Sequence, residues 1–73
     1  MTIGERIRAL RESAELSQSA LGEKLHMTQR KISYIETDMC EPSVEDIKAF
    51  CLIFEVSANY LLGLPKNLKH PKR

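Results

Sequence analysis

The sequence has little of what a secreted, membrane-spanning or metal-dependent protein needs. Its 73 residues include no tryptophan, 5% aromatic residues, three glycines and two cysteines. No apolar run approaches the roughly 18 residues that cross a bilayer, and Met1 is not followed by the basic and apolar segments of a secretory signal. Cys40 and Cys51 fit no tight zinc pattern with the two histidines. We therefore expect a cytoplasmic protein with reduced thiols and without metal, cofactor or membrane partner.

The short chain also limits what the protein does. A chain of 73 residues forms one domain with one small core. That size leaves no room for a substrate cleft, and nothing in the sequence brings serine, histidine and aspartate together as a nucleophile. We therefore expect the protein not to be an enzyme.

Charge is distributed unevenly, although the net charge is only +1. The segment 36–65 holds six acidic residues and a single basic one, Lys48. The segment 66–73 holds four basic residues and no acidic one. We expect a folded domain over 1–65 and a flexible basic tail over 66–73, which is either a solvated end or an arm that contacts phosphates. A polyanion would meet the first half of the chain or this tail.

Hydroxyl residues placed before apolar residues at helical spacing predict five short helices. Capping-box patterns begin at Thr2 and Ser43, with Glu5 and Asp46 three residues later. Helices are expected over about 3–13 and 28–36, from the Ser17 cap to Leu25, from the Ser43 cap to Phe54, and from the Ser57 cap to Leu62. Their inner faces would carry Ile3, Ile7, Leu10 and Ala14, then Ala20, Leu21 and Leu25, then Ile32 and Ile35, then Val44, Ile47, Phe50, Cys51 and Phe54.

Only His26 and Met27 separate the second and third predicted helices. So short a connection makes the two helices cross steeply, which is the helix-turn-helix arrangement. The sequence therefore predicts an all-α fold that contains a helix-turn-helix unit.

Several short motifs resemble the Cro/repressor-like, or xenobiotic-response-element, helix-turn-helix family over about residues 3–64. They are Ile-Gly-Glu-Arg-Ile-Arg at 3–8, Leu-Ser-Gln at 16–18, Leu-Gly-Glu-Lys-Leu at 21–25, Thr-Gln with Ile32 and Glu36 in the third helix, Pro42-Ser43, and Val-Ser-Ala-Asn-Tyr-Leu-Leu-Gly at 56–63. The order and spacing of the motifs carry the resemblance. It implies a lambda-repressor-like domain whose third helix lies in the DNA major groove.

The resemblance also implies roles for residues outside the third helix. Gln18 matches a glutamine that contacts a phosphate and steadies a glutamine of the recognition helix, here Gln29. Arg11 and Glu36 match a structural ion pair between the first helix and the end of the third.

On chemistry alone, the third helix carries side chains suited to DNA. Gln29 matches the major-groove edge of adenine, and Arg30 matches that of guanine. Phosphate contacts or a fit to the groove are expected of the remaining outward residues and of the two helix caps, namely Lys31, Ser33, Tyr34, Ser17 and Thr28.

Two departures from the family pattern, at His26 and in the loop 37–41, and one position that fits it, Gly22, bear on this interpretation. His26 stands at a turn position where the family usually has glycine, so a left-handed backbone is expected there. Gly22 is expected to let the third helix approach the second. The loop 37–41 carries two acids where the family often has a basic residue, so either DNA affinity is reduced or this loop faces a protein partner.

The leading hypothesis is a sequence-specific DNA-binding transcriptional regulator, a repressor that binds a two-fold operator as a homodimer. Leu52, Tyr60, Leu61 and Leu64 are candidates for its dimer surface. The alternative is a protein-interaction module on the same fold, antitoxin-like or regulator-binding, because fold alone does not decide function.

Overall fold

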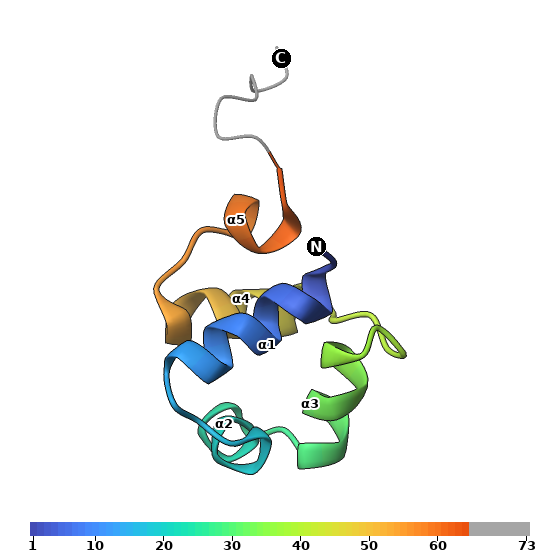
Figure 1. Ribbon diagram of the computed structural model, residues 1–73, viewed down its shortest axis with the longest axis vertical. Helices are drawn as coiled ribbons and strands as arrows, with labels where there is room; N and C mark the ends of the chain where they lie inside the picture. Colours follow the sequence, from blue (N-terminus) through green and yellow to red (C-terminus); the bar gives the residue numbers. More distant parts are fainter. Residues whose placement is uncertain (65–73) are drawn as a thin grey trace.

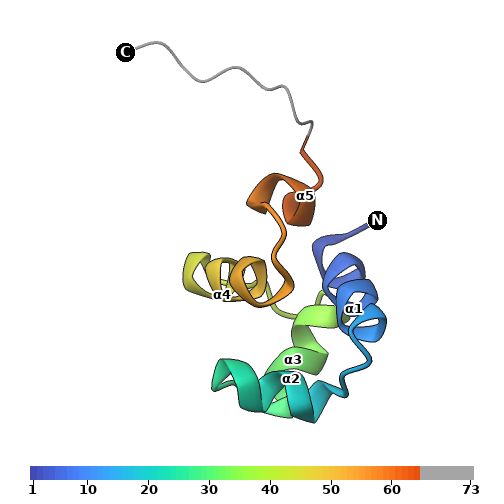
Figure 2. The same cartoon turned by 90° about the vertical axis from the view of Figure 1, so that its left-hand side faces the viewer.

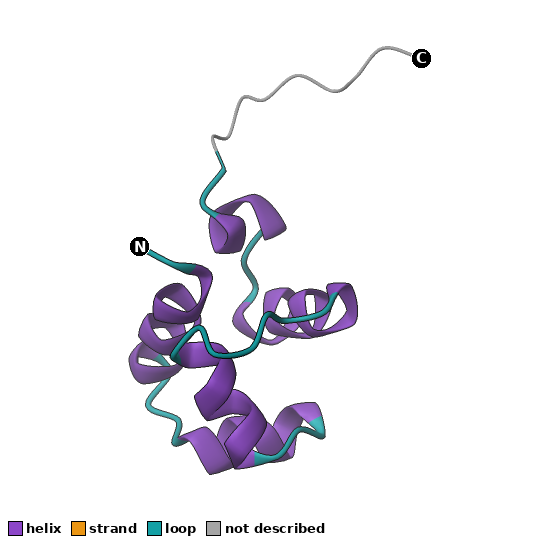
Figure 3. Ribbon diagram, turned by 90° about the vertical axis from the view of Figure 1, so that its right-hand side faces the viewer, coloured by secondary structure: helices purple, strands orange, loops and turns teal. Residues whose placement is uncertain are grey.

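The computed structural model describes residues 1–64, which form five α-helices and no strand (Figure 3). The helices are α1 (Ile3–Ser13), α2 (Gln18–Leu25), α3 (Gln29–Glu36), α4 (Val44–Phe54) and α5 (Ala58–Leu62). The α2–α3 pair lies at one end of the molecule, α1 and α4 lie across its middle, and α5 lies at the other end (Figures 1 and 2). The predicted all-α fold of five short helices is confirmed, whereas the predicted basic tail 66–73 falls outside the described residues. None of the described helices is both long and apolar enough to span a membrane.

A hydroxyl side chain begins every helix, as the sequence predicts. The five caps are Thr2, Ser17, Thr28, Ser43 and Ser57, and each oxygen accepts a hydrogen bond from the backbone N–H three residues later. Complete capping boxes form between Thr2 and Glu5 and between Ser43 and Asp46. A cap of this kind is worth about 1 kcal/mol, because it satisfies an N–H that has no partner within the helix.

All five helices contribute to one small core. Its fully buried side chains are Ile7, Leu21, Ile32, Ile35, Phe50 and Leu61. The short α5 packs against both α1 and α4, so a segment of five residues closes the core on the side opposite α2 and α3.

Three expectations about apolar side chains are wrong. Leu61 does not belong to a surface patch, because α5 folds back onto α1 and buries it completely. Val44 is 69% exposed, because the buried arc of α4 is centred on Phe50 and turns Asp46, rather than Val44, toward the interior. Ala14 is the exposed C-cap of α1, one residue beyond its last turn.

Candidate nucleic-acid interface

The connection between α2 and α3 fixes the angle at which α3 leaves the domain. His26 caps α2 in the left-handed conformation, at φ 58° and ψ 39°, as expected from its turn position. Gly22 lies directly beneath the connection, where a Cβ atom would approach the Met27 carbonyl oxygen to 2.5 Å. The tight helix-turn-helix therefore depends on a glycine in α2 and on a strained histidine after it.

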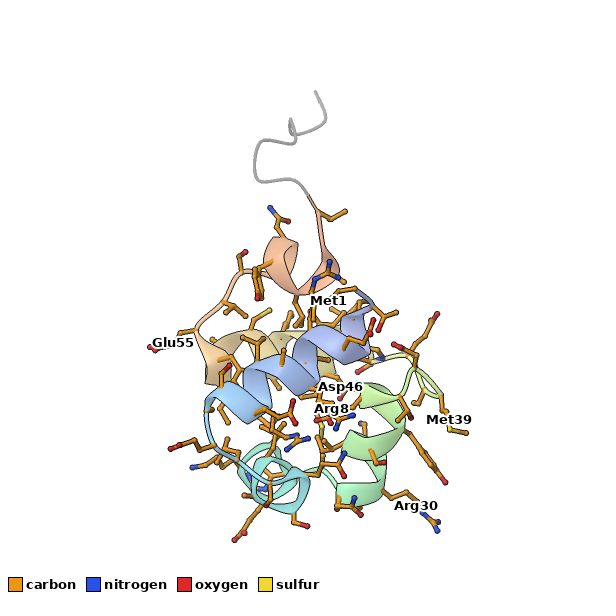
Figure 4. All side chains as sticks on the ribbon, in the orientation of Figure 1. Met1, Arg8, Arg30, Met39, Asp46 and Glu55 are labelled. Atoms are coloured by element: carbon orange, nitrogen blue, oxygen red, sulfur yellow. The ribbon has the colours of Figure 1, made fainter. Side chains whose placement is uncertain are left out.

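The side of α3 that faces away from the core carries Gln29, Arg30, Ser33 and Tyr34, which we call the outer face of α3. At 3.6 residues per turn, Ile32 and Ile35 fall on the opposite side, and both are buried. The Arg30 side chain extends away from the body of the domain (Figure 4). The outer face thus presents an amide and a guanidinium on the first turn of a helix, where both are accessible.

A hydrogen-bonded cluster of Arg11, Gln18, Gln29 and Glu36, the Glu36 cluster, lies along one flank of α3. Arg11 donates to both carboxylate oxygens of Glu36, from Nε at 2.6 Å and from Nη2 at 3.0 Å. Gln18 Nε2 donates to Glu36 Oε1 at 3.1 Å, and Gln29 Nε2 donates to Gln18 Oε1 at 2.6 Å. Arg11 on α1 therefore orients the Gln29 amide through Glu36 and Gln18.

The two charged members of the Glu36 cluster are largely inaccessible to solvent. The side chain of Glu36 is 1% exposed and that of Arg11 is 11% exposed. The hydrogen bonds to Glu36 raise the pKa of the Arg11 guanidinium above its ordinary value, and Arg11 also donates to the Leu16 carbonyl oxygen at 2.8 Å. Since each group has a partner, the buried charges do not carry the penalty of an unmatched ion.

The other flank of α3 is attached to α4 by a single ion pair. Lys31 Nζ lies 3.1 Å from Asp46 Oδ1, with side-chain exposures of 42% and 11%. The second oxygen of Asp46 accepts from the Ser43 backbone N–H at 3.0 Å. Desolvation opposes the charge of Asp46, but hydrogen bonds from Ser43 and Lys31 outweigh it and hold the pKa of this carboxyl below its ordinary value. Lys31, expected at the DNA surface, thus directs its ammonium toward α4.

The caps of α2 and α3 keep a donor available. The hydroxyl oxygens of Ser17 and Thr28 accept from Ala20 and Lys31 N–H groups, while a hydroxyl still has its own hydrogen to donate. Gln18 uses one of its two amide hydrogens on Glu36. The exposed end formed by the starts of both helices therefore combines donors with the positive pole of each helix dipole.

The acidic loop after α3 is partly engaged within the domain. Asp38 accepts from Thr2 Oγ1 at 2.7 Å and from the Gly4 backbone N–H at 3.2 Å. Gly4 permits this approach, since a Cβ atom there would collide with the backbone oxygen of Ile35. Asp38 thus holds the start of α1 against the end of α3, a role that no local pattern indicates because 34 residues separate it from Gly4. Glu41 stays exposed.

The short connection between α2 and α3, the glycine of α2 beneath it and the outward polar face of α3 define a helix-turn-helix domain. A family model described as a helix-turn-helix domain matches residues 2–60. The chain therefore belongs to the helix-turn-helix domain family.

Named relatives and solved structures agree with this assignment. The chain is 30% identical over 63 residues to the immunity repressor protein of Bacillus phage phi105 and to the HTH-type transcriptional regulator ImmR of Bacillus subtilis. These matches cover 86% of this chain but 44% and 50% of the relatives, so the chain spans about half their length. The P22 c2 repressor in complex with a synthetic operator is similar in structure, with a TM-score of 0.80 and 35% identity over 85% of this chain and 94% of that one.

Proposed function

We propose that this chain is the DNA-binding domain of a transcriptional regulator that inserts α3 into the major groove. The observation that supports the proposal most strongly is the Glu36 cluster, which holds the Gln29 amide in place beside the extended Arg30. A glutamine side chain that is already ordered in the free protein loses less conformational entropy when it binds a base edge. The repressor names of the relatives and the operator bound to the P22 c2 neighbour point the same way.

In the proposed complex, Gln29 pairs with adenine and Arg30 with guanine, because each side chain matches the donors and acceptors of that base edge. The groups expected on phosphates are Ser17, Gln18, Thr28, Ser33 and Tyr34. The backbone N–H groups of Gln18 and Ser19 at the start of α2 would join them, since no carbonyl within the helix reaches them.

Selection from random DNA duplexes, followed by single-base changes of the best site, tests this proposal. Arg30→Ala should cost about 1 to 3 kcal/mol on that site and relax selectivity at one base position of each half-site. Arg8→Ala is the matched control, because Arg8 is an exposed arginine on α1, outside the outer face of α3. If Arg30→Ala binds every duplex as the parent does while its circular dichroism is unchanged, α3 does not read DNA.

We further propose that two copies bind a two-fold site through an apolar surface on α4 and α5. A shallow hollow of about 350 Å³ is lined by Ile47, Lys48, Cys51, Leu52 and Ala58, and Leu52 is 80% exposed. Repressors of this fold occupy half-sites about one helical turn apart, which requires two domains. Because Leu61 is buried, this surface replaces the larger patch that the sequence indicates.

Sedimentation on the selected duplex measures the stoichiometry. We expect two chains per duplex for the parent, and weaker, less cooperative binding for Leu52→Lys because the change places a charge in the apolar contact. A 1:1 complex at saturation contradicts the homodimer. Failure of every duplex to bind, together with capture of a defined protein by the α4–α5 surface, would favour the protein-interaction alternative.

A further inference from the structure

We propose that Asp46 masks the charge of Lys31, so that this lysine of the recognition helix does not add to the attraction for DNA. The inference rests on the proposed function and concerns a residue of α4 that lies outside the outer face of α3. It assigns Asp46 as a positioning residue, which acts on DNA through Lys31.

Lys31 lies at the edge of the outer face of α3. Lys31 directly follows Gln29 and Arg30 in the first turn, the turn whose side chains meet DNA in this fold. At 100° per residue it lies between Arg30, on the outer face, and Ile35, in the core. A lysine at such an edge has two alternatives, which are a phosphate on one side and a group of the domain on the other.

The structure shows Lys31 bound to the domain. Its ammonium contacts Asp46 at 3.1 Å, and Asp46 is itself held in place by the Ser43 backbone N–H at 3.0 Å. Asp46 is only 8% exposed. Water therefore has little access to its carboxylate and does not readily replace the Lys31 ammonium there. Ion pairs of partly buried groups are also screened less by salt than exposed pairs are.

The expected consequence follows from counterion release. Each lysine that neutralises a phosphate steepens the dependence of log affinity on log salt by about 0.9. Lys31, paired with Asp46, contributes little to this slope in the parent. Once Asp46 is neutral, Lys31 is free to reach a phosphate, and it strengthens binding to any duplex regardless of sequence.

Asp46→Asn is the variant that frees Lys31 with the least structural damage. An asparagine oxygen still accepts from Ser43, which preserves the cap of α4, but it carries no charge for the lysine. Glu45→Gln is the matched control, because it makes the same change of net charge one residue away and likewise frees a lysine, Lys48, from a pair at 3.7 Å. That pair is exposed, and both of its members are on α4.

Fluorescence anisotropy with a random-sequence duplex of about 25 base pairs measures affinity from 50 to 200 mM salt. We expect Asp46→Asn to steepen the slope by about 0.9 for each bound chain, so that its advantage over the parent shrinks three- to fourfold across this range. Glu45→Gln should leave the slope near that of the parent. Thermal unfolding by circular dichroism confirms that each variant is folded at the assay temperature.

A double-mutant comparison with Lys31→Met completes the test. Methionine keeps the apolar stem and removes the charge, so Lys31→Met alone should leave the slope unchanged, and Lys31→Met in Asp46→Asn should restore the parental slope. The mask is refuted if Asp46→Asn and Glu45→Gln behave alike, or if Lys31→Met alone flattens the slope by a full contact. If the parent binds no duplex at all, both this inference and the proposed function fail, whereas binding by the parent with identical slopes for all variants removes this inference only.

Discussion

The two flanks of the recognition helix are attached to the domain in different ways. On the Gln29 side, the Glu36 cluster joins α1, α2 and α3 through four side chains around a nearly inaccessible carboxylate. On the Lys31 side, a single ion pair joins α3 to α4, and its lysine is 42% exposed. In the proposed complex, the first flank orients a group that faces DNA, whereas the second holds the Lys31 ammonium away from DNA. In a polar cluster that connects three helices, the remaining hydrogen bonds hold the helices in place when one is lost. A single ion pair is abolished by one substitution.

The largest expected effect comes from breaking the buried flank. Glu36→Gln leaves the Arg11 charge inside the domain without its carboxylate, so unfolding should become easier by about 3 kcal/mol. Urea denaturation measures the loss. Glu12→Gln is the control, because Glu12 pairs with Arg8 at the surface, 3.6 Å away, and should cost less than about 1 kcal/mol. Similar losses for the two variants would contradict the contrast between buried and exposed pairs.

A smaller effect should follow when the outer part of the same flank is cut. Gln18→Ala removes the proposed phosphate donor and also frees Gln29, so binding should weaken about tenfold, or 1.4 kcal/mol, on the selected site. Selectivity should fall at the base that Gln29 contacts. Ser19→Ala, at the next and exposed position, is the control for both measurements. If affinity falls equally on every duplex and selectivity is unchanged, Gln18 contacts a phosphate but does not position Gln29.

Removing the Lys31–Asp46 ion pair of the second flank should have the smallest effect on the free energy of unfolding, and this effect should depend on pH. The pKa of Asp46 is lowered in the folded protein, so its contribution is present above the ordinary value of 3.8 and is lost as pH falls through the folded value. Asp46→Asn should cost about 1 kcal/mol at neutral pH. The cost should shrink below about pH 4, where the parent loses the same charge.

Thermal unfolding from pH 7 to pH 2 tests this last expectation. The parent and Asp46→Asn should converge in stability as the pH falls. Glu45→Gln serves as the control, since it removes an exposed carboxylate from the same turn. A constant difference between the parent and Asp46→Asn over the whole range would show that the charge of Asp46 contributes nothing to the fold.

The contrast between the flanks also separates what could be predicted from the sequence from what could not. Helix starts follow from local chemistry, because a cap involves residues within a few positions of each other. The left-handed His26 and the need for Gly22 are expected from the resemblance to the family. The interpretation of Lys31 as a DNA contact did not anticipate its ion pair with Asp46, because the two residues are 15 positions apart. Only the tertiary fold brings them together.

The errors on apolar residues have a related cause. Helical spacing alone allows Val44 or Asp46 to face inward, and the tertiary environment selects the acid because Lys31 and Ser43 satisfy it there. Likewise, nothing local distinguishes Leu61 from the exposed Leu62 and Leu64, because their burial depends on where a short final helix docks. A periodic pattern predicts that a segment is helical more reliably than it predicts which side of the helix is buried.

The contact of Asp38 with Thr2 and Gly4 also has a consequence for local unfolding. It closes the chain into a ring that encloses α1, α2 and α3, while α4 and α5 remain outside it. The first turn of a protein commonly frays without effect on distant parts. Here, fraying at Thr2 and Gly4 also opens the ring beside Glu36, the residue that accepts from Gln18 and through it positions Gln29. Hydrogen exchange at the start of α1 is therefore expected to rise and fall together with exchange at the end of α3.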